Sequence, residues 1–347
     1  MREVLMKKFA PALLLLLLLF IANISGPVSP QTRERTVGVT RSEANSKTDV
    51  VKVDVDLVTV DALVLQKNTA RVVGNLKQDD FVISEDGVRQ SITHFSQDRL
   101  PLSVLLLIDR GGCLDPFGRE VRRAALEALS RLKPTDEVAV MTYHNSAELL
   151  QGFTRNRILI EDALNHVPPH DEEANHCLNK AFSEAASYMV QSGNPVGRRV
   201  VIAITGVTRN FDCPDGPSGK AATQSIFESG SVVCGIIPRT ADQQMENGMM
   251  IWATRVGGLA RMPSLNIQTL AEETGGEVLQ DKPEHLDSTF TTLITHLRTR
   301  YSLAFVSSNK KRDGSLRKLK IDVAPALQKS EGKLVVKARR SYVAPKG

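Results

Sequence analysis

The chain has 347 residues, of which 41% are hydrophobic and 24% are charged, which excludes a collagen-like, mainly disordered or multi-spanning membrane protein. A net charge of +5 is too small an excess to require a nucleic acid as partner, and none is expected. The length predicts about two domains, and four cysteines are too few for a disulfide scaffold.

Residues 1–26 have the pattern of a secretory signal peptide. Basic residues precede an almost wholly apolar run, 9–24, which Ser25 and Gly26 follow. At about 16 residues the run is shorter than the roughly 20 that span a bilayer, so we expect cleavage; a retained single anchor is the alternative, and the only membrane contact expected. In either case the protein is exported, to the periplasm or outside the cell. Residues 27–50, rich in Ser, Thr, Pro and charge, are expected to be a flexible linker.

Residues 51–98 are expected to form a small antiparallel β segment. Apolar residues alternate over 51–65, and one slip of phase at Leu57–Val58 predicts a bulge or a bend. Asp86-Gly87 is typical of a tight hairpin turn. Further strand patterns lie at 70–73, 81–85 and 89–95. A unit of this size is marginal alone.

Strand and helix patterns alternate through residues 101–299. The run LSVLLLI at 102–108 is apolar throughout, which favours a central parallel strand buried on both faces. The other strand patterns lie at 138–143, 199–205, 231–238 and 277–280. The helix patterns lie at 117–132, 174–190, 267–273 and 283–299. This alternation predicts an α/β domain with a doubly wound, mostly parallel sheet.

Residues 300–345 return to strand patterning. The expected strands lie at 301–306, 316–323 and 334–343. Three strands do not easily form a domain alone, whereas chain ends often lie close together. We therefore expect this segment to pair with 51–98 in a small antiparallel β-sandwich, into which the α/β domain is inserted.

Three segments resemble a von Willebrand factor A (VWFA) domain: LSVLLLIDRGGC at 102–113, VAVMTYHN at 138–145 and RRVVIAITG at 198–206. The chain as a whole is similar to secreted VWFA-related proteins of acidobacteria. Matching segments, in order, are 55–98, 148–157, 270–276, 297–305 and 339–345. The resemblance implies an exported, non-enzymatic module that binds or scaffolds protein partners in the cell envelope or outside the cell.

The resemblance also implies a metal-ion-dependent adhesion site (MIDAS), in which a DxSxS loop, a Thr and a second Asp hold Mg²⁺ or a similar hard cation. Asp109 keeps the first position, but Gly111 and Cys113 stand where the family has serines. The Thr position falls at His176, and Gly206 replaces the second Asp. Hard cations take oxygen ligands, so we expect a degenerate site with no cofactor, which still binds partners. A rebuilt divalent-cation site at Asp109, in a metal-dependent adhesion protein, is the alternative.

Cysteine and histidine residues are expected at the same edge of the sheet, where Cys113, His176, Cys177 and Cys213 would all project from loops. These residue types suit Zn²⁺, but no tight ligand spacing supports such a site. A disulfide is favoured in an exported protein. Cys177 with Cys213 is the preferred pair, because their loops are neighbours in this fold. Cys234 lies in an apolar strand and is expected in the core.

No catalytic arrangement emerges from the sequence. A nucleophilic Cys113 with His144 or His176 lacks an orienting third residue and an oxyanion hole, so a hydrolase is the least favoured alternative. The connection 239–264 contains the only tryptophan, Trp252, and four methionines. It is interpreted either as an adaptable contact surface or as a segment packed into the core.

Overall fold

The computed structural model describes residues 57–97, 100–169, 175–194, 197–239 and 263–346. The predicted signal and linker, and Trp252 with its neighbouring methionines, lie outside the described residues. No helix of the described part has both the length and the hydropathy needed to cross a bilayer.

A six-stranded sheet is the framework of the α/β domain, in the order β12-β10-β8-β5-β6-β7. Adjacent strands within this sheet run parallel, except that the edge strand β7 is antiparallel to β6. The bounds are β5 (Leu102–Asp109), β6 (Glu137–Tyr143), β7 (Ala147–Thr154), β8 (Arg198–Ile204), β10 (Val232–Pro238) and β12 (Val278–Asp281). Every residue of β5 is buried, as its unbroken apolar run predicts. The α/β fold class with a mostly parallel sheet is confirmed.

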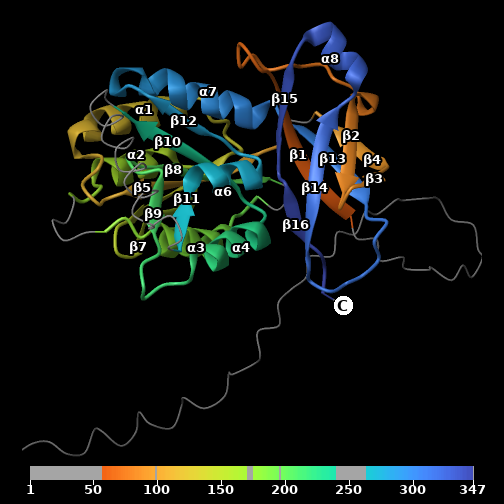
Figure 1. Cartoon of the computed structure of the whole chain (residues 1–347). Coiled ribbons are helices and arrows are strands. Elements are labelled where there is room, and N and C mark those ends of the chain that lie inside the picture. Colours follow the sequence, from red (N-terminus) through yellow and green to blue (C-terminus); the bar gives the residue numbers. More distant parts are fainter. Residues whose placement is uncertain (1–56, 98–99, 170–174, 195–196, 240–262, 347) are drawn as a thin grey trace, which may run out of the picture. The chain divides into compact units, whose positions relative to one another are not determined.

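Helices cover both faces of this sheet (Figure 1). One layer contains α1 (Gly118–Ser130), α2 (Arg157–Asn165) and α7 (Leu286–Arg298). The other contains α3 (Leu178–Met189), α4 (Gly219–Ser229) and α6 (Ile267–Thr274). Successive residues of β5 alternate between the layers, because side chains along a strand point to opposite faces: Leu106 packs with the first layer and Leu107 with the second.

The two terminal segments form an antiparallel sandwich around a third apolar cluster. One sheet has the order β15-β1-β13-β4 and the other β16-β14-β2-β3. The strands are β1 (Leu57–Gln66), β2 (Phe81–Glu85), β3 (Val88–Gln90), β4 (Ile92–Ser96), β13 (Tyr301–Val306), β14 (Leu316–Val323), β15 (Leu334–Ala338) and β16 (Ser341–Val343). In both sheets, strands that precede the α/β domain pair with strands that follow it. This is the expected insertion of the α/β domain into a sandwich formed by the two terminal segments.

Several local expectations need correction. The strand expected at 70–73 is only an isolated bridge from Val72 to Leu65. The bulge expected at Leu57–Val58 is absent, since β1 pairs with β13 in continuous register from Leu57 to Ala62.

The hairpin turn at Asp86-Gly87 is present as expected, with positive φ at both residues. The remaining elements are β9 (Arg209–Phe211), β11 (Ser264–Asn266), α8 (Pro325–Glu331) and the 3-10 turns Gln78–Asp80, Asp115–Phe117 and Pro283–His285.

Candidate functional site

Asp109 is the last residue of β5, at the edge of the sheet where open α/β folds bind ligands. Its side chain is 0% exposed. The hydroxyls of Tyr143 and Thr205 donate to Oδ2 at 3.0 and 2.6 Å, and the backbone N–H of Gly111 donates to Oδ1 at 2.8 Å. Tyr143 ends β6 and Thr205 follows β8, so the ends of three adjacent strands meet at one carboxylate.

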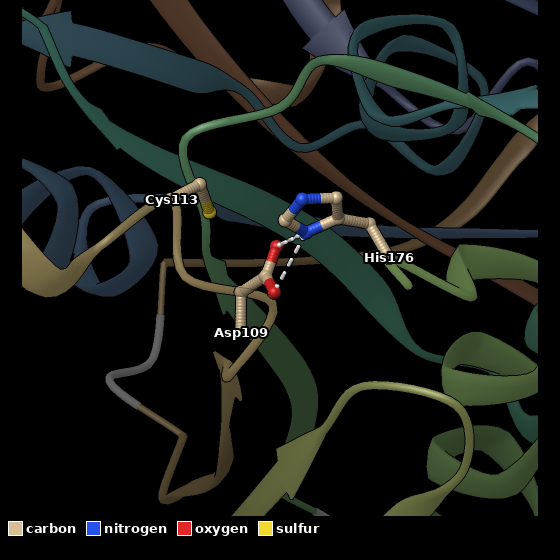
Figure 2. A group of neighbouring side chains, drawn as sticks. All are labelled: Asp109, Cys113 and His176. Carbon is tan, nitrogen blue, oxygen red and sulfur yellow. Dashed lines mark hydrogen bonds and ion pairs between the residues drawn. The ribbon is translucent and has the colours of Figure 1, made fainter. Parts of the chain in front are cut away.

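His176 completes the donors around this carboxylate. Its Nδ1 lies 2.9 Å from each carboxylate oxygen of Asp109, and Figure 2 shows this nitrogen facing the carboxylate. The residue lies in the loop before α3, where the side chain of Asn210 from β9 donates to its carbonyl oxygen. The following residue, Cys177, is joined by a disulfide to Cys213. These links hold the imidazole over Asp109 while 23% of its side chain stays exposed.

The electrostatics of the pair are those of an internal ion pair. Burial alone would raise the pKa of Asp109, but the hydrogen bond and charge of His176, with the hydrogen bonds from Thr205 and Gly111, bring that pKa below its ordinary value. The hydrogen bond from Asp109 raises the pKa of His176, and the carboxylate charge adds to this against the effect of burial. Both shifts favour a protonated imidazole next to an ionised carboxylate.

The thiol of Cys113 is held on the same side of the site. Its Sγ accepts the backbone N–H of Gly206 at 3.1 Å and lies 4.0 Å from the hydroxyl of Thr205. Burial, and then the negative charge of Asp109, raise the pKa of this thiol. The thiol therefore stays protonated at neutral pH, whereas a cysteine nucleophile acts as its thiolate.

Two glycines make room for these side chains. A Cβ at Gly111 would lie 2.4 Å from the ring of His176, and a Cβ at Gly206 would lie 2.9 Å from the Cβ of Cys113. A serine at 111 or an aspartate at 206, the residues of the family pattern, would therefore require the imidazole or the thiol to move. The four positions that differ from the family pattern pack against one another in two pairs, Gly111 with His176 and Gly206 with Cys113.

A hard cation does not fit this arrangement. Mg²⁺ takes oxygen ligands in a near-octahedral set, whereas only Asp109 remains of the family's ligand pattern and its oxygens already accept hydrogen bonds. A softer ion is better matched. Asp109, Cys113 and His176 offer oxygen, sulfur and nitrogen atoms that all lie within 4.8 Å of one another.

The structure thus brings Asp109, Gly111, Cys113, His176 and Gly206 together. The disulfide takes the sulfurs of Cys177 and Cys213 out of consideration as zinc ligands. Cys234 is a free, buried thiol within β10, and the pKa of this thiol is raised to about 11, chiefly by burial.

The sequence analysis missed the roles of Tyr143 and Thr205. The available signal was their position, because each stands at the end of a strand next to β5. The guanidinium of Arg110, the residue after Asp109, donates to Glu148 at 3.3 Å and to the carbonyl oxygen of Pro169 at 3.1 Å.

Residues 104–208 match the sequence model of the von Willebrand factor type A domain. The chain contains a VWFA domain. The matched segment includes β8 and all the residues gathered around Asp109.

Several solved structures are similar to this chain. One is an aerotolerance-related membrane protein from Bacteroides fragilis, with 15% identity, a TM-score of 0.41, and coverage of 56% of this chain and 98% of that one. Another is BatB from Bacteroides thetaiotaomicron, with 14% identity, a TM-score of 0.39 and the same coverage of 56% and 98%. The vWF domain of the pilus tip protein Mfa5 from Porphyromonas gingivalis has 13% identity, a TM-score of 0.28 and coverage of 35% and 43%. Among curated proteins no match is found.

Proposed function

We propose that this protein is an exported, non-enzymatic module that binds protein partners through the sheet edge bearing Asp109, without the hard cation of the standard adhesion site. VWFA domains commonly mediate protein interactions, which supports the first part. The second part is carried by one observation: the buried carboxylate of Asp109 accepts hydrogen bonds from backbone, hydroxyl and imidazole donors of the chain itself.

The imidazole of His176 supplies the positive charge that a cation would otherwise provide. A buried carboxylate needs a compensating charge or several hydrogen bonds, and Asp109 has both. A cation at the same place would have to displace the imidazole and also overcome its charge. The edge is therefore complete as a binding surface without an ion.

The state of the Cys113 thiol supports a non-enzymatic role. The Sγ of Cys113 accepts a hydrogen bond from Gly206, and burial keeps its pKa raised. Its neighbour Asp109 is an anion, which disfavours a thiolate further. The side chains at this edge therefore stabilise a folded surface rather than an attacking nucleophile.

The test is partner capture by crosslinking from the envelope fraction, with and without EDTA. We expect EDTA to leave capture unchanged and Asp109→Asn to reduce it, because loss of the carboxylate charge releases His176. His166→Gln is the matched control, since His166 is exposed at the end of α2 and forms an ion pair only within its own helix. Capture that disappears with EDTA and returns with Mg²⁺ would contradict the proposal.

The second candidate is a metal-dependent adhesion protein with a rebuilt site. It is favoured by the convergence of Asp109, Cys113 and His176, whose donor atoms suit Zn²⁺ better than Mg²⁺. Calorimetry with Mg²⁺, Mn²⁺ and Zn²⁺ separates the two candidates. The first predicts no saturable binding of any of these ions. Saturable Zn²⁺ binding that is lost in Cys113→Ser would establish the second.

A further inference from the structure

A cavity of about 330 Å³ lies beside the Asp109 site. Its walls come from the end of β5, the first half of α1, the end of α2 and the residues that follow α2. The helices α1 and α2 belong to the same layer (Figure 1). The apolar lining includes buried side chains, among them Leu114, Val121, Ala125 and Leu164, and the less buried Val167, Pro168 and Pro169. This volume is within the usual range for sites that enclose a small ligand or a side chain.

Arg122 on α1 lines the cavity, as do Asp109 and Asp115. Within the described residues this half-buried arginine has neither a hydrogen bond nor an ion pair. Its neighbour on the helix, Arg123, forms an ion pair with Asp287 at 2.9 Å. A guanidinium at the rim of an apolar cavity is a receptor for a carboxylate, because its planar N–H groups match the two carboxylate oxygens.

The other charged groups of the lining are already engaged. Arg110 is paired with Glu148, and Asp109 is paired with His176. Asp115 is exposed and has an interaction partner of its own. Arg122 is therefore the one charged side chain of the lining that has no partner among the described residues. The pairing of Asp109 with His176 also limits the repulsion that Asp109 would exert on an incoming anion.

We propose that this cavity receives an apolar side chain of the protein partner, and that a carboxylate next to that side chain binds the guanidinium of Arg122. The proposal rests on the proposed function, because it specifies what the partner presents to the edge bearing Asp109. Arg122 thereby recognises an acidic group of the partner. The apolar walls select the neighbouring side chain.

A matched pair of small probes tests this recognition on the full chain. N-acetyl-leucine carries an isobutyl side chain and a carboxylate, whereas N-acetyl-leucinamide has the same body without the charge. Titration of the ¹⁵N-labelled protein should shift amide resonances of Val121 and Ala125. We expect the acid to bind about tenfold more tightly than the amide, the usual size of one charge-assisted contact.

Variants separate the charge of Arg122 from the general charge of the helix. In Arg122→Gln the acid should lose its advantage over the amide, while both probes still shift the resonances of the cavity. Arg119→Gln is the control, because Arg119 is exposed on the same helix and does not line the cavity. It should leave the difference between the probes intact. The fold of each variant is checked by its amide spectrum without probe.

Equal affinity for acid and amide in the wild-type protein would overturn the proposal. So would an equal loss in Arg119→Gln and Arg122→Gln, or shifts confined to residues outside the cavity. None of these results depends on partner capture or on EDTA. Failure of this proposal is therefore distinguishable from failure of the proposed function.

Discussion

Two buried carboxylates of this protein are satisfied by similar sets of donors in very different places. Glu85, at the end of β2 in the terminal sandwich, accepts hydrogen bonds from Arg317, Ser307 and Tyr342. Asp109, at the end of β5 in the α/β domain, accepts them from an imidazole, a threonine hydroxyl, a tyrosine hydroxyl and a backbone N–H. Each site thus combines a cationic side chain with two hydroxyl groups.

The difference lies in the cation. Arg317 is 3% exposed and is always charged, so the pair with Glu85 is closed and permanent. The side chain of His176 is 23% exposed and loses its charge as the pH rises, so its ion pair with Asp109 depends on pH. The comparison indicates that the first carboxylate has a permanent charge partner, whereas the charge of the second one's partner depends on pH.

Removing the permanent cation should have the largest effect. Arg317→Met leaves Glu85 buried without its charge partner, and we expect the free energy of unfolding to fall by about 3–5 kcal/mol. Urea unfolding followed by circular dichroism measures the loss. Lys320→Met removes an exposed cation from the same strand, β14, and should change stability far less. If both variants were equally stable, Glu85 would not depend on Arg317.

Restoring a family ligand should come next in size. Gly206→Asp places a Cβ 2.9 Å from that of Cys113, and overpacking of this kind costs about 1–3 kcal/mol. The control is Gly74→Asp, since a Cβ there meets nothing within 4 Å. Addition of Cys113→Gly, which removes that Cβ, to Gly206→Asp should recover part of the loss. We expect neither Gly206→Asp nor the double variant to gain Mg²⁺ binding by calorimetry, because His176 still pairs with Asp109. A gain of Mg²⁺ binding would show that the missing second carboxylate alone prevents the site from holding the ion.

Much of the fold could be predicted because its signals are local. The apolar run at 102–108 specifies a strand that is buried on both faces, and the hairpin at Asp86-Gly87 needs only two residues with positive φ. The elements that were missed have weaker local signals. Most residues of β7 are half-buried without clean alternation, and α2 is a nine-residue helix that begins after Asn156. Tertiary packing determines such elements more than their own sequence does.

The same limit applies to the site. The sequence placed Asp109, Cys113 and His176 at one edge, because the carboxyl ends of parallel strands lie together. It could not show that the imidazole faces the carboxylate, since that depends on the side-chain orientation of a loop residue held by Asn210. It also could not reveal the cavity, whose wall includes the end of the unexpected helix α2.

Removing the pH-dependent cation, His176, should lower the free energy of unfolding less than removing Arg317. His176→Gln keeps a hydrogen-bond donor near Asp109 but loses the charge, and we expect a loss of about 1–2 kcal/mol at mildly acidic pH. His166→Gln is the control, because the ion pair of His166 with Asp162 is exposed on α2. Denaturation in urea measures both. Equal stability of the two variants would mean that His176 adds nothing beyond a surface contact.

The pH dependence of the Asp109–His176 ion pair should be the smallest effect. Its sign at acidic pH is opposite to its sign at alkaline pH. The pKa of Asp109 is below 3.8 in the folded protein, so its contribution is present above pH 3.8 and is lost as the pH falls through the folded value. The pKa of His176 is above 6.5 in the folded protein, so its contribution is complete below pH 6.5 and is lost as the pH rises through the folded value. The stability difference between wild type and His176→Gln should therefore be largest between these limits and shrink by about 0.5–1 kcal/mol in alkaline solution. The matching difference for Arg317→Met should stay constant there, because an arginine keeps its charge. Urea midpoints measured across the pH range for all three proteins decide this, and a difference for His176→Gln that grows in alkaline solution would contradict the assigned ion pair.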